Sequence, residues 1–470
     1  MKITRLMLAG GLLGWSIATT AVAQDIATQN ARRDSAVRPV AFAYDNYLGD
    51  ASKEAAPQKT TEPAACCDAE AACGGCKSSA CRWCTQGKLA DPWTLFGGDA
   101  LKDRNIAVGG WLDGGIYSNQ WGQGSTNGGG GNGPVGMRTL SNSFELNQAW
   151  VFAEKKTDTQ GYGWDIGGRI DFLMGTDAGY TQCYGDGSWD YNWDMNGGWY
   201  QSAMPQIYAE IAYNDLKVKA GHFYTPIGNE VVQAPLNFFY SHSYAHTYGE
   251  PFTHTGALAT YALNEKLSVL GGWTNGWDEG FRSFDRGSTF LGGLVFTANE
   301  KNTMAWYCSA GKLGNGAAFG GTGASGDIIY NCFLWTHKFN EKATYIFEAD
   351  IGNNDNVTVP GAVDNQWYAL VNYLTYKLND CWSVGGRLEW FQDPQGARVL
   401  YEANDAFFGA HGDYFELTCG VNYKPHANLT IRPEIRYDWL NTFTDTAVLP
   451  FDNGTKDTQL SGGVDVIFTF

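Results

Sequence analysis

The connectors between the strand-like segments of this chain alternate between short and long, and this rhythm is the strongest constraint on its fold. From about residue 105 onward, segments of roughly ten residues with apolar side chains at every second position are separated by such connectors. Short connectors, such as "ND" at Asn214 and "NEK" at Asn264 and Asn299, have the composition of tight turns. Long connectors, such as 175–204 and 311–326, are rich in glycine. Tight turns at one rim and long loops at the other are the arrangement of an outer-membrane β-barrel.

The number of strand-like segments is about sixteen, and an even number places both ends of a barrel at the rim with the short turns. The segments lie near residues 105–118, 142–154, 163–174, 205–214, 216–225, 254–263, 267–275, 288–298, 303–312, 327–338, 343–351, 366–377, 381–391, 412–423, 429–439 and 459–470. The sequence therefore predicts an all-β fold: a transmembrane, antiparallel, up-and-down β-barrel of about 16 strands.

The strands have one apolar and one charged face. In "LTIRPEIRYDWL", Leu429, Ile431 and Ile435 alternate with residues such as Arg432 and Glu434. A soluble β-sandwich would alternate in the same way, with its apolar face inward. The connector rhythm, an export signal and aromatic residues near the strand ends favour a membrane barrel instead. The aromatic residues that we expect in the interfacial girdles are Trp150, Trp164, Trp273, Tyr423 and Trp439.

If the apolar face meets lipid, the charged face lines the interior of the barrel. The acidic residues that alternation assigns to the interior are Asp113, Glu145, Asp165, Asp171, Glu210, Glu348, Asp350, Glu389, Glu416, Glu434, Asp438 and Asp465. The basic ones are Arg169, Lys217, Lys219, Arg387, Arg432 and Arg436. Acidic residues are in excess, so the interior is expected to attract cations weakly.

The first residues have the pattern of a secretory signal peptide. Lys2 and Arg5 precede the apolar run "LMLAGGLLGWSIA", and the small residues "AVA" end at Ala23. We therefore expect a signal peptide at 1–23 and a mature chain that begins at Gln24. A membrane anchor is the less favoured alternative, because the run is short for a transmembrane helix.

Residues 24–91 differ from the rest of the chain, because they lack apolar periodicity and carry the cluster "CCDAEAACGGCKSSACRWC". We interpret them as a flexible periplasmic leader, followed by the barrel at 92–470. Disulfides are the favoured use of its cysteines in an oxidising compartment, and a metal or free thiols are the alternatives. The candidate cysteines are Cys66, Cys67, Cys73, Cys76, Cys81 and Cys84.

Charge and motifs exclude other classes of function. The net charge of -17 argues against a nucleic-acid partner, which needs a clustered basic surface. The sequence contains no G-x-S-x-G, H-E-x-x-H or P-loop motif, so we do not expect an enzyme. A hydrolase built on the barrel rim is the remaining enzymatic alternative.

Three segments carry a resemblance to a known family: "GHFYTPIGNE" at 221–230, "PFTHTG" at 251–256 and the closing "GGVDVIFTF". With the strand and turn rhythm, they resemble the OmpL-like group of outer-membrane β-barrel porins over about residues 92–470. The terminal Phe470 is similar to the C-terminal signature by which such barrels are recognised for assembly.

The resemblance implies a water-filled channel in the cell outer membrane for ions and small polar solutes, without a cofactor. The implied partners are outer-membrane lipid and the barrel assembly machinery, and a homo-oligomer is compatible with the sequence. The alternative function is a non-conducting barrel that serves as an adhesin, a receptor or an envelope anchor.

The segment 226–252 is the third long connector, and the third loop of sixteen-stranded general porins folds into the channel and narrows it. By analogy, we expect five residues to line a constriction: Glu230, Asn237, His242, His246 and Glu250. A surface loop with an aromatic plug is the alternative. The two histidines alone are weak evidence for a metal, and we expect none.

A further hypothesis concerns the field across this constriction. Arg432 and Arg436 are expected to face Glu230 and Glu250 across the interior, which would create a transverse field that orients polar solutes.

Overall fold

The structure is a computed structural model, and it describes residues 83–122, 131–138, 140–183, 189–190, 193–195, 199–283, 286–314, 326–355, 364–399, 410–443, 449–452 and 454–470. The predicted signal peptide and most of the predicted leader, with Cys66, Cys67, Cys73, Cys76 and Cys81, lie outside these residues. No helix in the described ranges is both long and apolar enough to cross a membrane.

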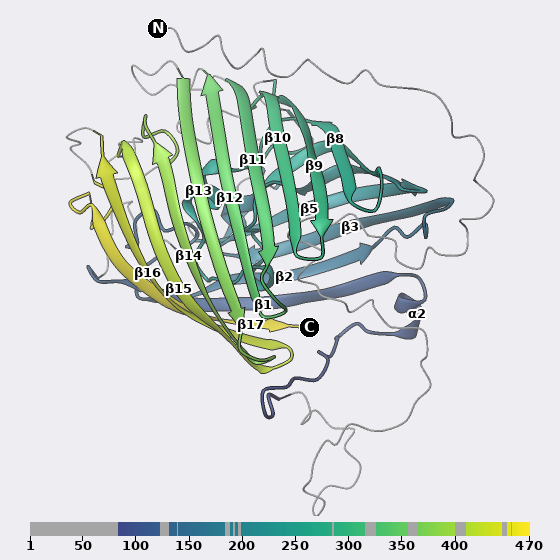
Figure 1. Ribbon diagram of the computed structural model, residues 1–470, viewed down its shortest axis with the longest axis horizontal. Coiled ribbons are helices and arrows are strands. Elements are labelled where there is room, and N and C mark those ends of the chain that lie inside the picture. The colour runs from purple at the N-terminus through teal and green to yellow at the C-terminus, as the bar shows by residue number, and fades with distance from the viewer. Residues whose placement is uncertain are drawn as a thin grey trace, which may run out of the picture. The chain divides into compact units, whose positions relative to one another are not determined.

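Sixteen antiparallel strands of the described chain form one closed barrel (Figure 1), which confirms the predicted fold class. Their bounds are β1 (Ile106–Asn119), β2 (Ser143–Lys155), β3 (Trp164–Gly175), β5 (Tyr200–Tyr213), β6 (Leu216–Tyr224), β7 (Thr253–Ala262), β8 (Leu267–Thr274), β9 (Ser288–Asn299), β10 (Asn302–Lys312), β11 (Asp327–Lys338), β12 (Ala343–Asp355), β13 (Asp364–Lys377), β14 (Trp382–Asp393), β15 (Gly412–His426), β16 (Leu429–Thr442) and β17 (Thr458–Thr469). The two-residue strand β4 (Asp194–Met195) adds to β5, and the short helices α2 (Asp99–Lys102) and α3 (Ala178–Thr181) flank the barrel strands in the chain.

The barrel closes between its first and last strands. β1 pairs antiparallel with β17 from Trp111 opposite Thr469 to Asn119 opposite Ser461. Every strand edge is therefore paired, as the lipid environment requires, because no water is present there to bond free N–H and C=O groups.

The strand bounds agree with the sequence prediction to within a few residues, and the start of β5 differs most. The predicted strand starts at residue 205, which is a proline and cannot donate a ladder hydrogen bond. The strand instead begins at Tyr200, and a register shift between Asp171 and Leu173 of β3 accommodates the proline. The two-faced pattern therefore extends further toward the loop side than the sequence indicated.

The two faces of the barrel follow the predicted alternation. Apolar side chains such as Ile166, Leu388 and Ile435 are 63%, 47% and 55% exposed, as expected for a surface that meets lipid. Charged side chains at the intervening positions, such as Arg387 and Arg436, are buried inside the barrel.

The prediction that Trp150 belongs to an aromatic girdle is wrong. Its ring is buried, stacks on Trp111 at a centroid distance of 4.6 Å, and donates from Nε1 to Asp171 at 2.9 Å. A register shift between β1 and β2 leaves Asn147 without an opposite residue. Such a bulge reverses which face the following residues occupy, so simple alternation from Glu145 fails at Trp150.

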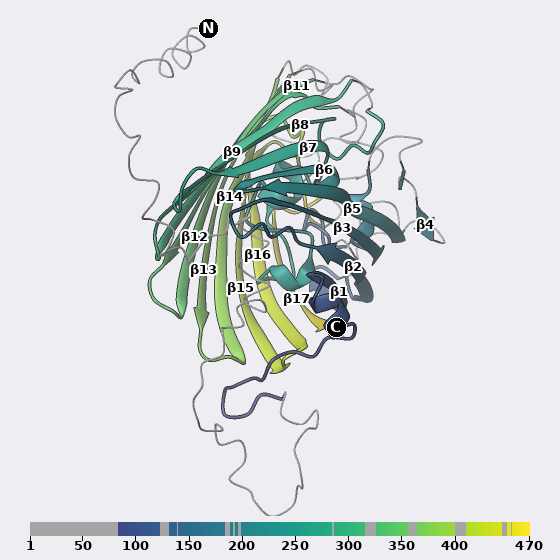
Figure 2. The same cartoon turned by 90° about the vertical axis from the view of Figure 1, so that its right-hand side faces the viewer.

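Residues 83–93 lie against the rim that carries the short turns (Figure 2). The backbone N–H of Cys84 donates to the carbonyl of Pro425 at 2.7 Å, and the side chain of Asn428 exchanges two hydrogen bonds with the backbone of Trp93, at 2.8 and 3.1 Å. A disulfide joins Cys84 to Cys381 in the turn between β13 and β14. Cys84 is thus a disulfide cysteine, with a partner in the barrel that the sequence analysis did not name.

We expect this disulfide to appear directly in a peptide map. Tryptic digestion of the unfolded, unreduced protein should yield the peptides 83–88 and 378–387 as one linked species, which separates on reduction. Replacing both Cys84 and Cys381 with serine should lower the free energy of unfolding by about 2–4 kcal/mol, because the open chain gains entropy in the unfolded state. Recovery of the two peptides unlinked, with an alkylatable thiol at each cysteine, would contradict the pairing.

Candidate functional site

The segment 225–252 between β6 and β7, called the inner loop below, lies inside the barrel. It contains the 3₁₀ turn η2 (Ala234–Leu236) and the π-helical turn η3 (Ala245–Gly249) (Figure 2). The five residues expected at a constriction are all buried in this loop: Glu230, Asn237, His242, His246 and Glu250. The geometry thus agrees with the first of the two expected arrangements, a loop folded inward.

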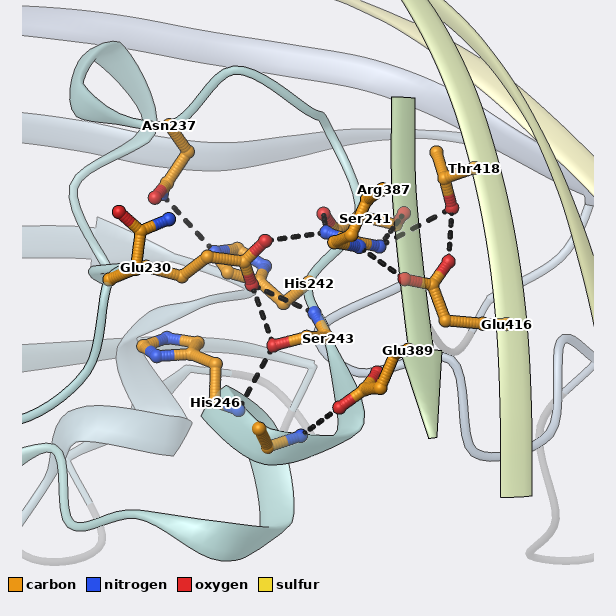
Figure 3. Close-up of polar contacts among 12 residues, drawn as sticks. Glu230, Asn237, Ser241, His242, Ser243, His246, Arg387, Glu389, Glu416 and Thr418 are labelled. Carbon is orange, nitrogen blue, oxygen red and sulfur yellow. Dashed lines mark hydrogen bonds and ion pairs between the residues drawn. The ribbon is translucent and has the colours of Figure 1, made fainter. Parts of the chain in front are cut away.

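Arg387 of β14 is the main contact between the barrel wall and the inner loop (Figure 3). Its Nη1 donates to Glu230 at 2.6 Å and to the carbonyl of Ser241 at 2.9 Å. Its Nε donates to Glu416 of the neighbouring strand β15. One guanidinium therefore neutralises a carboxylate of the loop and a carboxylate of the wall, in a geometry that suits its planar set of donors.

Two arginines of β16 hold further parts of the loop by its backbone. Arg432 donates to the carbonyls of Ala234 and Asn237 at 2.9 and 2.8 Å, and Arg436 donates to the carbonyl of His242 at 2.6 Å. Each arginine is also paired with a wall carboxylate, Arg432 with Asp465 and Arg436 with Asp438.

The hypothesis that Arg432 and Arg436 face Glu230 and Glu250 across the interior is wrong. Glu230 is paired with Arg387 instead, and the two β16 arginines pair with carboxylates of their own wall. Alternation gives the face of each side chain but not the path of the loop, so the partner of Glu230 could not be derived from it.

Carboxylates of the wall accept hydrogen bonds from the loop backbone. Glu389 accepts from the N–H groups of Tyr244 and Ala245, both at 2.7 Å. Glu434 accepts from the N–H groups of Tyr240 and Ser241, at 2.7 and 3.1 Å. With the arginines, these carboxylates bond several backbone N–H and C=O groups of the loop, which a buried loop needs in place of water.

Two other loops also contact the inner loop, through arginines that the sequence analysis missed. Arg138 donates to the carbonyl of Tyr240 at 3.2 Å and is paired with Asp177, and Arg398 donates to the carbonyl of Tyr248 at 2.6 Å. Both arginines lie in long connectors, where alternation gives no side-chain direction. The only signal was a lone basic residue in each loop.

The electrostatics of the loop follow from burial and from these pairs. Burial alone would raise the pKa of Glu230, but the Arg387 guanidinium outweighs it and holds the pKa below its usual range. Burial lowers the pKa of His246 to about 4 and that of His242 well below its ordinary value. The two rings stack at a centroid distance of 4.8 Å, so neutral pH leaves an uncharged histidine pair beside a charged Arg387–Glu230 pair.

Acid is expected to loosen the inner loop through His246. When the loop is released, the imidazole of His246 has its ordinary pKa of about 6.5. As the pH falls from about 6.5 toward 4, the released loop therefore binds more protons than the packed loop, and the packed arrangement loses stability over that range. Neither ring nitrogen of His246 has a hydrogen-bond partner in the described chain. His246→Phe should therefore keep the loop in place at pH 7 and reduce the acid-induced change in channel noise. An identical pH response in the variant and the unmodified protein would exclude His246 as the titrating group.

Six of the other predicted lining residues form a second group on β3, β5 and β6. Arg169 and Asp171 are buried and paired with each other, with Nε to Oδ1 at 2.6 Å. The remaining four are only partly buried: Asp165, Glu210, Lys217 and Lys219. Residues on this wall thus keep access to solvent, whereas the inner loop covers the charged side chains of β14 to β17.

Comparison with known proteins agrees with this architecture. The family described as "Putative beta-barrel porin-2, OmpL-like" matches residues 105–470, and the chain belongs to this family. It is an outer-membrane porin, and the resemblance seen in the sequence is confirmed. A search among curated proteins found no match.

Solved structures resemble this chain at low sequence identity. The outer membrane channel DcaP of Acinetobacter baumannii matches 80% of this chain and 100% of its own length, with 11% identity and a TM-score of 0.52. The trimer form of OmpT, an outer membrane protein of Vibrio cholerae, matches 78% of this chain and 99% of its own, with 14% identity and a TM-score of 0.47. An anion-selective porin from Comamonas acidovorans matches 78% and 99%, with 10% identity and a TM-score of 0.48.

Proposed function

We propose that this porin is a diffusion channel for ions and small polar solutes, and that the inner loop narrows it from one side. The observation that carries the proposal is the asymmetric attachment of the loop. Its backbone and Glu230 are bonded to side chains of β12, β13, β14, β16 and β2, whereas Asp165, Glu210, Lys217 and Lys219 on the β3, β5 and β6 wall keep access to solvent. A passage between the loop and that wall would be lined by charges of both signs.

The predicted organisation of the rest of the chain is part of this proposal. Residues 1–23 act as a signal peptide, residues 24–91 form a periplasmic leader, and the barrel reaches the outer membrane through the assembly machinery. The chain carries no enzymatic activity. Association into a homo-oligomer, with which the sequence is compatible, is part of the same proposal.

Single-channel recording on the refolded mature chain tests the proposal. Stable conductance steps in a planar bilayer are expected from a pore with a fixed constriction. A folded barrel that inserts without any conductance would favour the alternative, a non-conducting adhesin, receptor or envelope anchor.

Selectivity provides a separate prediction. The inward side chains and the inner loop carry more acidic than basic groups, although most of those on the β14 to β17 wall are paired. Salt screens the remaining excess over roughly 8 Å, so it should bias permeation without blocking it. We expect a reversal potential that indicates weak cation preference under a salt gradient. Clear anion preference would show that the assignment of charges to the pore is wrong.

A further inference from the structure

A second polar cluster lies on β11 and β12. It differs from the cluster around Arg387 because it contains carboxyl groups and a thiol but no arginine. Cys332 of β11 and Glu348 and Asp350 of β12 all point into the barrel, and the Cys332 Sγ and one oxygen of each carboxylate lie within 4.8 Å of one another. All three side chains are at most 2% exposed. Alternate positions on paired strands share a face at close spacing, which explains why these three side chains converge.

A fourth group reaches this cluster from the inner loop. Glu250 is 4% exposed, no N–H or O–H group of the described chain donates to its oxygens, and its carboxyl group interacts with that of Glu348. Its carboxylate packs over Gly228, where a Cβ would lie 1.9 Å from Oε2, so the chain leaves room for it only because residue 228 is glycine. The two oxygens of Asp350 likewise have no hydrogen-bond partner among the described residues.

The cluster lacks the positive charge that its carboxylates need. The side chains that act most strongly on Glu250 are Asp350, Glu348, Glu230 and Glu389, and all four are acidic. On the β14 to β16 wall, by contrast, Arg387 is paired with Glu230 and Glu416, and Arg436 is paired with Asp438. Uncompensated buried charge is costly, so a cluster of this kind is either protonated or bound to a cation.

We propose that Cys332, Glu348, Asp350 and Glu250 form a binding site for one divalent metal ion of the zinc class. Cys332, Glu348 and Asp350 are a compact, buried set of three ligands, and Glu250 beside them supplies the fourth that zinc requires. The thiol favours zinc over calcium or magnesium, which take oxygen ligands. The metal would join β11 and β12 to Glu250, near the end of the inner loop. The loop would then be held by arginines on one side and by a metal on the other. This inference does not depend on whether the pore conducts.

No metal was expected from the sequence. The only candidate ligands in it were the histidine pair of the inner loop and the cysteines of the leader. Glu348 and Asp350 appeared there as ordinary lining charges. Neither the approach of Cys332 from the next strand nor that of Glu250 from the loop is visible in the local pattern.

The test is metal content after refolding. The full mature chain is refolded with Zn²⁺, washed with a chelator and analysed for bound zinc by mass spectrometry. The leader cysteines could also bind zinc, so the comparison is between the unmodified protein and Asp350→Asn, which leaves the leader unchanged. Asp113→Asn is the matched control, because Asp113 is also a buried carboxylate whose oxygens have no hydrogen-bond partner in the described chain.

We expect the unmodified protein to bind one zinc ion per chain more than Asp350→Asn, and Asp113→Asn to match the unmodified protein. Zinc affinity at the site should fall by more than about tenfold in Asp350→Asn. Even substitutions of residues that only hydrogen-bond to metal ligands lower metal affinity by about 10–100-fold. In protein refolded with Co²⁺, the thiolate charge-transfer band should lose the contribution of one site in Cys332→Ser. This second variant also serves if Asp350→Asn does not fold, as judged by its gel mobility before and after heating.

Three results would overturn the proposal. Equal zinc content in the unmodified protein, Asp350→Asn and Cys332→Ser would place all bound metal elsewhere. Binding of Ca²⁺ without Zn²⁺ would show that the ligand class is wrong. Absence of bound zinc would show that the carboxyl groups share protons instead of a metal.

Discussion

Replacing Arg387 with methionine is expected to release the inner loop and to raise the single-channel conductance several-fold. The change leaves Glu230 of the loop and Glu416 of the wall buried without their shared cation. Removing one member of a buried ion pair costs about 3–5 kcal/mol. The loop can avoid this cost by moving Glu230 into water. Conductance and current noise in a planar bilayer would report the movement.

Two comparisons make this result specific to the loop. Glu230→Gln removes only the partner on the loop and leaves Arg387 bound to Glu416, so its effect should be smaller. Lys155→Met breaks a pair with Asp165 that is partly exposed, and such pairs contribute less than about 1 kcal/mol. Unchanged conductance in Arg387→Met, in a barrel that folds normally, would show that this arginine does not hold the constriction.

Introducing an arginine on the lipid face is expected to destabilise the barrel strongly. Leu370 lies in the middle of β13, points outward and is 39% exposed. Arginine near the midplane of a bilayer costs about 2–4 kcal/mol in a transmembrane barrel, because its charge cannot be hydrated there. Equilibrium unfolding of Leu370→Arg in lipid vesicles should show a loss of this size.

The matched control is Leu378→Arg, at the rim with the short turns. Leu378 is 48% exposed, similar to Leu370, but it lies in the turn after β13, where an arginine can reach water. Its cost should be about 0–1 kcal/mol. Equal losses at the two positions would mean that the barrel surface near Leu370 does not face lipid.

The strands could be predicted from the sequence because their signal is local. In β16, every second residue from Leu429 to Trp439 is apolar or proline, and the observed strand spans the predicted one. Turns such as Asn264 to Lys266 are equally local, since the Asn264 side chain accepts hydrogen bonds from the N–H groups of the turn itself. Strand count, pairing order and the position of both barrel ends follow from these signals.

The contacts of the inner loop could not be predicted, because they join residues far apart in the chain. Glu230 and Arg387 were both expected to face the interior, but their pairing depends on the path of the loop across the barrel. Trp150 shows a different limit. One unpaired residue at Asn147 changes the face of those that follow, and nothing in the local pattern marks that bulge.

The bond between Cys84 and Cys381 also imposes an order of events on export. The two residues are 297 positions apart, so in the export that we propose, with the N-terminus first, Cys84 reaches an oxidising compartment long before its partner. Cys66, Cys67, Cys73, Cys76 and Cys81 arrive with Cys84 and offer it nearer thiols. The native bond is therefore not the first that the chain can form. Maturation of this porin requires that Cys84 be kept reduced until Cys381 arrives, or that an early disulfide be exchanged for the native one.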